Sequence, residues 1–276
     1  MENILFKNND IFFIINDIII INDYDIIPDK SSVLFVNNIN LNKDINNIEI
    51  YLNKLKEYSH RYIIILDKSD FMLSENISIP DNVKYIYSNN IIYDHFKIKF
   101  IPMGRDFRSI SNYIIPNLKN ERNILCYCNF SLNTHSIRKK IFNRIKNKKF
   151  IKFEHMGNFL NYNISRETFF DRLINSKFTI CPRGNAFDTF RFYDSIYSGS
   201  IPIVIREKYH NNNCFNNIPI LFLNNIKDYN KLTRAYLLSQ YEILSPMLSN
   251  YYPGLDFNWW INNMKKDLEE STVTLP

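Results

Sequence analysis

One stretch of the sequence, residues 177–205, constrains the fold of this chain more than any other. It begins with a short apolar run at 177–181, which a proline ends because proline cannot continue a central strand. Apolar side chains then recur at helical spacing and predict a helix over 187–198, which Gly199 is expected to cap, before a buried strand at 201–205. A strand, a crossover helix and a second strand of this length form one βαβ unit of a parallel sheet.

The loop and helix of this unit carry polar groups that suit an anionic ligand. Gly184 is free to adopt a positive φ and to let a ligand approach the backbone. Asp188, Arg191 and Asp194 recur three residues apart just beyond a strand, where open α/β sheets bind ligands. Arg191 can hold a phosphate in a bidentate contact, and a carboxylate one turn away can accept from ribose hydroxyls. A solvated helix face with an Arg–Asp ion pair explains the same spacing equally well.

Two groups of residues in this part of the chain match a known signature. The first group is Phe178, Pro182, Gly184, Thr189, Arg191, Asp194, Gly199, Ile201, Pro202 and, as a substitution, Ile203. The second group is Cys128, Asn129, Phe130, Ser131, Thr134 and Arg138. Over residues 122–205 the chain therefore resembles the exostosin-like glycosyltransferase family, and in particular its soluble bacterial and viral members. The family usually has Glu where this chain has Asp194, which shortens the reach to a ribose by one methylene.

The resemblance implies an α/β fold of the GT-B type, in which two Rossmann-like domains face each other across a cleft and the C-terminal one binds the nucleotide. We expect an N-terminal α/β acceptor-side domain at 1–104, a linker at 105–121 and a nucleotide-sugar-binding domain at 122–254. The remaining segment, 255–276, is expected to form a terminal helix that crosses back to the N-terminal domain.

Alternating strand and helix patterns support a separate N-terminal α/β domain. The runs at 11–15 and 18–21 are joined by Asn16 and Asp17, a two-residue connection that predicts a hairpin. With that hairpin the first sheet would be mixed.

The resemblance, together with positions at strand ends, assigns a set of donor-binding residues. The set consists of Asn129, Ser131, Arg138, Arg183, Gly184, Asp188, Thr189, Arg191 and Asp194. Asn129 and Ser131 directly follow a strand and can offer backbone N–H groups to a phosphate, although Asn and Ser are also ordinary turn residues. Arg138 is assigned to the diphosphate, and Arg183 either clamps a phosphate or faces water.

An inverting sugar transfer needs a general base that takes the proton of the acceptor hydroxyl. In a GT-B fold this base is expected from the first domain, where Asp67 follows a strand and Asp94 lies in a turn. Asp70, His95 and Asp106 are further candidates, and each of these residues alone is more often a turn or cap residue. Because no Asp-x-Asp motif stands at a strand end of the second domain, we expect arginines and helix dipoles, not a metal or another cofactor, to stabilise the departing diphosphate.

The net charge and the spacing of the cysteines limit the possible binding partners and the cellular compartment that we expect. A net charge of +6 fits anionic ligands such as nucleotide diphosphates and also loose nucleic-acid binding, but no aromatic residues interleave with the basic ones, so no nucleic acid is expected. The four cysteines have neither disulfide nor zinc spacing and are expected to be free thiols in a reducing compartment. The N-terminus lacks the basic region of a signal peptide, and the apolar run at 11–21 is too short and too polar to span a membrane. These features predict a cytoplasmic protein, in the host cytoplasm if the protein is viral.

The expected function is transfer of a sugar from a nucleotide-diphosphate donor, with UDP favoured, to a hydroxyl of a glycan or glycoprotein. The reaction is expected to be inverting and independent of metal. Two alternatives stay open: a nucleotide-sugar or glycan-binding relative that has lost turnover, and a basic nucleic-acid-binding protein. Turnover of the donor would separate the first alternative from an enzyme, and steep salt dependence of nucleic-acid binding would favour the second.

Overall fold

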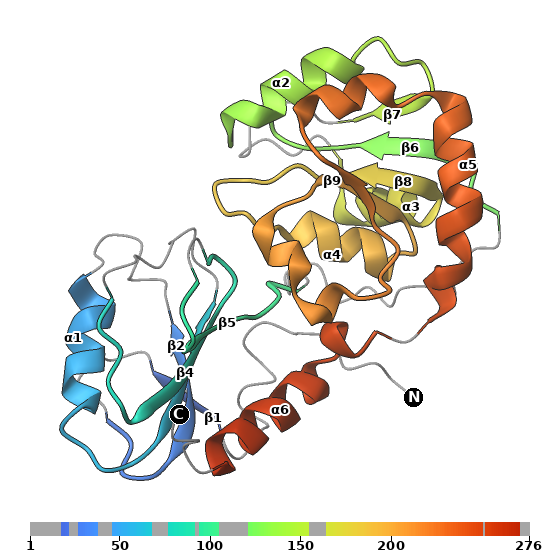
Figure 1. The fold of residues 1–276 in the computed structure, drawn as a ribbon. Coiled ribbons are helices and arrows are strands. Elements are labelled where there is room, and N and C mark those ends of the chain that lie inside the picture. Colours follow the sequence, from blue (N-terminus) through green and yellow to red (C-terminus); the bar gives the residue numbers. More distant parts are fainter. Residues whose placement is uncertain are drawn as a thin grey trace. The chain divides into compact units, whose positions relative to one another are not determined.

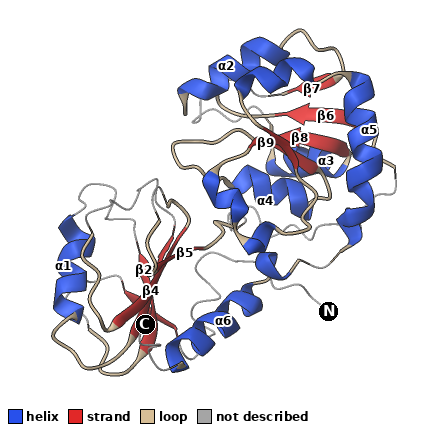
Figure 2. Cartoon of the chain, in the orientation of Figure 1, coloured by secondary structure: helices blue, strands red, loops and turns tan. Residues whose placement is uncertain are grey.

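The computed structural model of the chain describes residues 18–21, 27–37, 46–67, 77–91, 94–104, 121–154, 164–250 and 252–270. The chain forms two compact units: unit 1 comprises residues 1–103 and 253–276, and unit 2 comprises residues 104–252. Each unit contains a five-stranded sheet covered by helices (Figure 1, Figure 2). The predicted α/β class with two Rossmann-like parts is therefore confirmed. None of the described helices is long and apolar enough to cross a bilayer.

All described strands of unit 1 are parallel, in the order β1-β2-β3-β4-β5. They are β1 (Ile18–Ile21), β2 (Ser32–Asn37), β3 (Tyr62–Asp67), β4 (Val83–Ser88) and β5 (Ile98–Phe100). The sequence of β3, YIIILD, is a continuous apolar run, which is typical of parallel strands covered on both faces.

The described part of this sheet is parallel and not mixed, contrary to the sequence-based expectation. Ile18 of β1 lies opposite Val33 of β2 in a parallel pair. A run of four isoleucines has no alternation of apolar and polar side chains, so its sequence does not distinguish a hairpin strand from a buried parallel one. The other half of the predicted hairpin, at 11–15, and its turn at 16–17 lie outside the described residues.

Two helices pack on the sheet of unit 1. The apolar face of α1 (Asn46–Leu55) is buried in a cluster with side chains of β2, β3 and β4. The helix α6 (Phe257–Glu269) contacts β2 and β3, and its Asp267 accepts a hydrogen bond from Tyr87 Oη at 2.7 Å. Lys99 Nζ lies 2.6 Å from the same carboxylate. The helix that follows unit 2 in the sequence thus completes the fold of unit 1.

Unit 2 has a parallel sheet in the order β10-β9-β8-β6-β7. Its strands are β6 (Ile124–Cys128), β7 (Ile151–Phe153), β8 (Ser176–Ile180), β9 (Ile201–Ile205) and β10 (Leu221–Leu223). Its α-helices are α2 (Ser136–Ile145), α3 (Arg166–Ile174), α4 (Phe190–Tyr197) and α5 (Arg234–Leu244). The predicted βαβ unit is confirmed as β8-α4-β9, with Phe178 opposite Ile201.

The strand order of unit 2 fixes where a ligand site is expected. β6 is followed along the chain by its neighbour on one side, β7, and then by its neighbour on the other side, β8. The order of the sheet therefore reverses between β6 and β8. In open α/β sheets, ligands bind beyond the carboxyl ends of the strands at such a point.

The helix α4 begins later than the sequence predicts. Its first residue is Phe190, after Thr189 in the N-cap position, so Asp188 precedes the helix instead of belonging to a polar stripe on it. Asp188 Oδ1 accepts from Thr189 N at 2.9 Å, a local contact of the kind that favours Asp in turns over helix interiors. At the other end, Gly199 has a φ of 69° and caps the helix as predicted.

Candidate functional site

The loops that follow β6 and β8 meet at the switch point of unit 2 and contain most of the predicted donor-binding residues. Residues 129–131 follow β6, and residues 181–184 follow β8. Arg138, in the first turn of α2, joins the two loops: its Nε donates to Arg183 O at 2.8 Å and its Nη1 to Ser131 O at 3.2 Å. The arginine assigned to the diphosphate therefore also fixes the distance between the two loops.

Arg138 carries a buried charge that has no opposite charge beside it among the described residues. Its side chain is buried, and no carboxylate pairs with it in the described part of the chain. Burial, and then the nearby charge of Arg191, lower the pKa of Arg138 to about 10. The positive charges of Arg138 and Arg191 repel each other. An anion bound near both guanidinium groups would therefore stabilise the charged form of each.

Arg191, at the start of α4, holds the second of these charges. Its Nη2 donates to Asn129 Oδ1 at 3.3 Å, whereas its Nε is buried without a hydrogen-bond partner among the residues the structure describes. Thr134 Oγ1, in the loop before α2, is a second buried polar atom of this kind. Most buried polar groups in proteins are hydrogen-bonded, so two exceptions at one sheet edge make this edge a candidate site for a polar ligand.

Gly184 lies beside the guanidinium of Arg138. A Cβ atom at this position would lie 3.4 Å from Arg138 Nη2 and 3.7 Å from Thr134 Cγ2. Gly184 does not use the positive φ that is open to a glycine, since the described glycines with positive φ are Gly104 and Gly199. What the glycine contributes is space, because a side chain here would cover part of Arg138.

Arg183 lies beside Arg138, and these two residues and Arg191 are called the arginine cluster below. The guanidinium carbon of Arg183 lies 3.8 Å from the centre of the Phe187 ring. Its Nη2 donates to Asn185 O at 2.9 Å, and its Nε donates to Gly184 O at 3.3 Å. Like Arg138 and Arg191, it has no ion-pair partner within the described ranges.

Three other predicted donor residues, Asp188, Thr189 and Asp194, lie in or just before α4 and have different surroundings. Asp188 is 1% exposed, and its Oδ2 accepts from Tyr193 Oη at 2.6 Å, so this carboxylate fastens the β8-α4 loop to the helix. Thr189 occupies the N-cap position of α4 and lines a pocket described below. Asp194 lies one turn beyond Arg191 and is buried.

The two predicted base candidates belong to unit 1 and do not come together. Asp67 is the last residue of β3, at the carboxyl edge of the sheet. Asp94 precedes β5, on the amino-terminal side of a strand parallel to β3, and is exposed. Parallel strands place these positions toward opposite edges, so they cannot both belong to one site at the carboxyl edge.

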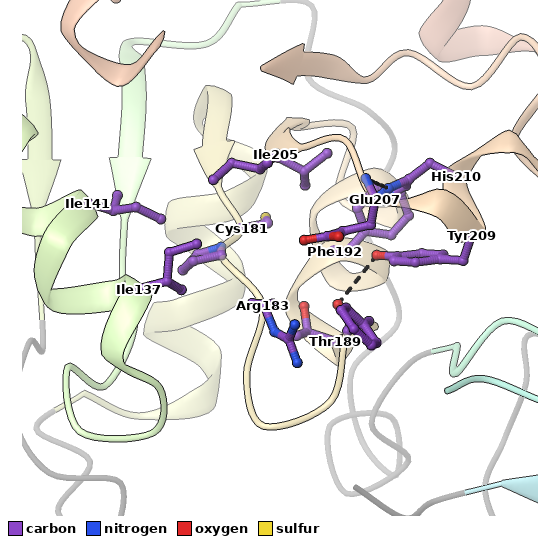
Figure 3. A pocket seen from close by; sticks show the side chains of 13 residues that line it. Ile137, Ile141, Cys181, Arg183, Thr189, Phe192, Ile205, Glu207, Tyr209 and His210 are labelled. Carbon is purple, nitrogen blue, oxygen red and sulfur yellow. Dashed lines mark hydrogen bonds between the residues drawn. The ribbon is translucent and has the colours of Figure 1, made fainter. Parts of the chain in front are cut away.

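A pocket adjoins the arginine cluster at the carboxyl ends of β8 and β9 (Figure 3). Ile137, Ile141 and Ile205 form apolar walls. Arg183 of the arginine cluster and Thr189, two residues before Arg191, also line the pocket. Figure 3 shows the Glu207 carboxylate pointing toward the middle of the labelled side chains. Burial raises the pKa of Glu207, although the charge of Arg183 opposes this shift.

Sequence analysis did not identify Glu207. The only signal available was its place just after β9, at the edge where ligands bind. A carboxylate with a raised pKa in a pocket is typical of a functional site.

The family match includes the site just described, and the matches to solved structures extend over most of the chain. The family described as Exostosin GT47 domain matches residues 51–215. Among solved structures, an α1,3-fucosyltransferase matches with a TM-score of 0.51 and 14% identity, over 91% of this chain and 80% of that chain. The apo structure of OtsA matches with a TM-score of 0.51 and 9% identity, over 89% of this chain and 74% of that chain. Both similarities show a GT-B type fold. A comparison with curated proteins gave no match.

Proposed function

The chain belongs to the exostosin GT47 family and is a glycosyltransferase, and from this premise we propose that it binds a nucleoside diphosphate sugar at the arginine cluster of unit 2. The sugar passes to an acceptor hydroxyl of a glycan or glycoprotein, with inversion at the anomeric carbon and without a metal. The family resemblance favours uridine as the nucleoside.

One observation carries this proposal: the buried Nε of Arg191 has no partner among the described residues and lies next to a second buried arginine that lacks a counter-charge. A diphosphate supplies negative oxygens at the spacing that guanidinium groups recognise. The N-terminus of α4 adds its own preference for negative charge. The same groups would stabilise the charge that develops on the diphosphate as the glycosidic bond breaks.

We assign the Glu207 pocket to the sugar that the donor carries. The pocket adjoins the cluster through Arg183 and Thr189, so a group attached to the bound diphosphate can reach it. An ionised carboxylate accepts hydrogen bonds from sugar hydroxyls, and the isoleucine walls suit the apolar faces of the ring.

The proposed reaction is a single displacement. A carboxylate of unit 1 takes the proton of the acceptor hydroxyl, whose oxygen attacks the anomeric carbon while the bond to the diphosphate breaks and the nucleoside diphosphate leaves with the electron pair. Of the two base candidates, Asp67 is the one at the carboxyl edge of its sheet, and we assign the role to it.

Nucleoside diphosphates should raise the melting temperature of the protein equally in EDTA and in magnesium or manganese. A ligand that binds only the folded state at about 100 times its Kd stabilises that state by about 2.7 kcal/mol. A panel of UDP, GDP, ADP, CMP and dTDP, read by thermal unfolding, tests both the donor class and the metal independence. A shift that appears only with a divalent metal would contradict the metal-independent mechanism, and no shift with any nucleotide would contradict the proposed site.

Glu207→Gln should weaken binding of the sugar nucleotide but not of the nucleotide alone. The substitution keeps the shape and removes the charge, and a hydrogen bond to a charged group contributes roughly 1.5–3 kcal/mol. Calorimetric titration with the nucleoside diphosphate and with its sugar conjugate should therefore show a loss of about tenfold or more for the conjugate only. Glu242→Gln, on the exposed part of α5, is the matched control. Equal losses for both ligands would overturn the assignment of the pocket to the sugar.

A further inference from the structure

We propose that Tyr127 and Glu154 are positioning residues for donor binding, which orient the Asn129 amide and through it the guanidinium of Arg191. This inference rests on the proposed function, since it concerns the same anion site. Neither Tyr127 nor Glu154 belongs to the sequence signature of the site. They reach it through a chain of hydrogen bonds that starts at the end of β7 and crosses β6 to α4.

The contacts form one continuous line. Tyr127 Oη lies 3.1 Å from Glu154 Oε2 and donates to it. Asn129 Nδ2 donates to the same Tyr127 Oη at 3.0 Å. Asn129 Oδ1 in turn accepts from Arg191 Nη2 at 3.3 Å. Tyr127 and Asn129, in the middle of this line, are buried, whereas Glu154 and Arg191 at its two ends are half-buried.

The ionised carboxylate of Glu154, at one end of this line of hydrogen bonds, determines which atom donates and which accepts in each bond. An ionised carboxylate only accepts hydrogen bonds, so the single proton of Tyr127 Oη must point toward it. The phenol oxygen is then left as an acceptor on its other side, and the NH₂ group of Asn129 must face it. The amide oxygen consequently faces Arg191. The opposite orientation of the amide would direct its NH₂ group at the guanidinium, and both groups are donors.

Glu154 is held in the ionised state that this argument needs. Burial alone would raise the pKa of Glu154, but hydrogen bonds from Arg172, Lys152 and Tyr127 outweigh it and lower the pKa below its usual value. Arg172 Nε lies 2.8 Å from Glu154 Oε1, and Lys152 Nζ lies 3.3 Å from the same oxygen.

These hydrogen bonds fix the orientation of the Arg191 guanidinium, which is proposed to bind the diphosphate of the sugar nucleotide. With Nη2 bound to the amide oxygen, the guanidinium is held in one plane while Nε keeps its donor unused among the described residues. A guanidinium held in advance loses less conformational entropy when an anion binds. The chain from Glu154 to Asn129 therefore preorganises the anion site without contacting the anion.

Tyr127→Phe tests this role, because it removes one oxygen and leaves the ring in place. We expect inorganic pyrophosphate and UDP to bind about tenfold more weakly to the variant, in line with the loss of one buried hydrogen-bond link. Combining Tyr127→Phe with Asn129→Ala should weaken binding no further than Asn129→Ala alone, since both changes break the same chain. If Tyr127→Phe does not fold, Glu154→Gln should produce the same loss of affinity, because a glutamine no longer dictates the direction of the phenol proton.

Tyr87→Phe is the matched control. Tyr87 Oη also donates to a carboxylate, that of Asp267, but it lies in unit 1, so its loss should lower stability without changing pyrophosphate affinity. Unchanged affinity in Tyr127→Phe, or losses that add in the double variant, would overturn the positioning role and leave the proposed function intact. Absence of pyrophosphate and nucleotide binding by the unmodified protein would overturn both.

Discussion

Arg191→Ala should abolish measurable binding of nucleoside diphosphates while the protein stays folded. Removing one partner of a buried, hydrogen-bonded charge pair costs roughly 2–5 kcal/mol in binding, which is at least about 30-fold in affinity. Among the described residues, the unliganded protein loses the hydrogen bond to Asn129 and a contact of the guanidinium, 5.9 Å from the centre of the Phe169 ring. It also gains relief from a like charge, because Arg191 lowers the pKa of Arg138. Unfolding in urea should therefore show little change in stability, and titration with UDP or pyrophosphate should show the loss.

Two further variants make this result specific. Arg191→Lys keeps the charge but not the planar fork of donors, so we expect an intermediate loss of affinity. Arg144→Ala removes a half-buried arginine of α2 whose Nη1 donates to Asn230 Oδ1 in an exposed hydrogen bond, and nucleotide affinity should not change. A nucleotide affinity of Arg191→Ala equal to that of the unmodified protein would contradict the assignment of the arginine cluster to the diphosphate.

The sequence predicted the βαβ unit well because each of its parts has a local cause. The apolar run of β8, the helical spacing of α4, the cap at Gly199 and the buried run of β9 are all read from neighbouring residues, and all are found. Arg191 was assigned from its spacing in the predicted helix and from the family signature; the structure places it at the start of α4, and its role in donor binding stays a prediction. The start of α4 was missed by three residues, because Asp188 forms local hydrogen bonds that compete with the helix.

The parts of the site that were not predicted depend on contacts between distant segments. Tyr127 looks like an ordinary buried strand residue, and Glu154 like a polar residue after a strand. Their link to Arg191 arises only when β6, β7 and α4 are placed side by side. Glu207 was missed for the same reason. Its carboxylate, which follows a strand, becomes part of a pocket only when residues of α2 approach it in the folded structure. Sequence periodicity contains no information about such approaches.

Arg122 is another residue that the sequence does not mark, although it is nearly fully buried and connects the ends of three elements. Its Nη1 donates to Leu173 O, Ile174 O and Ser176 O at 3.3, 2.6 and 3.0 Å. Its Nη2 donates to Ser198 O at 3.0 Å, just beyond α4. The last carbonyls of a helix have no partner within the helix, and a cation is favoured there. Arg122 satisfies such carbonyls after both α3 and α4.

Arg122→Met should therefore lower the free energy of unfolding of unit 2 by roughly 3–5 kcal/mol, because a side chain of similar length leaves several buried carbonyls without donors. In a unit of this size, 1 kcal/mol corresponds to about 2–4 °C, so the melting temperature should fall by roughly 6–20 °C. Calorimetry is the suitable measurement, since two units can give two transitions and only that of unit 2 should move.

The control for this variant is Arg144→Met, which removes an arginine of the same unit that forms an exposed hydrogen bond; it should change the free energy of unfolding by less than about 0.5 kcal/mol. A loss below 1 kcal/mol in Arg122→Met would contradict the role of Arg122 in joining α3, β8 and α4. Comparison with Arg191→Ala separates the two arginines by their effects. Arg122→Met should lose stability and, where it is folded, still bind nucleotide, whereas Arg191→Ala should keep stability and lose the nucleotide. Arg122 thus stabilises the fold because its N–H groups donate to carbonyls at helix ends. Arg191 is instead available to a ligand because its Nε has no hydrogen-bond partner among the described residues.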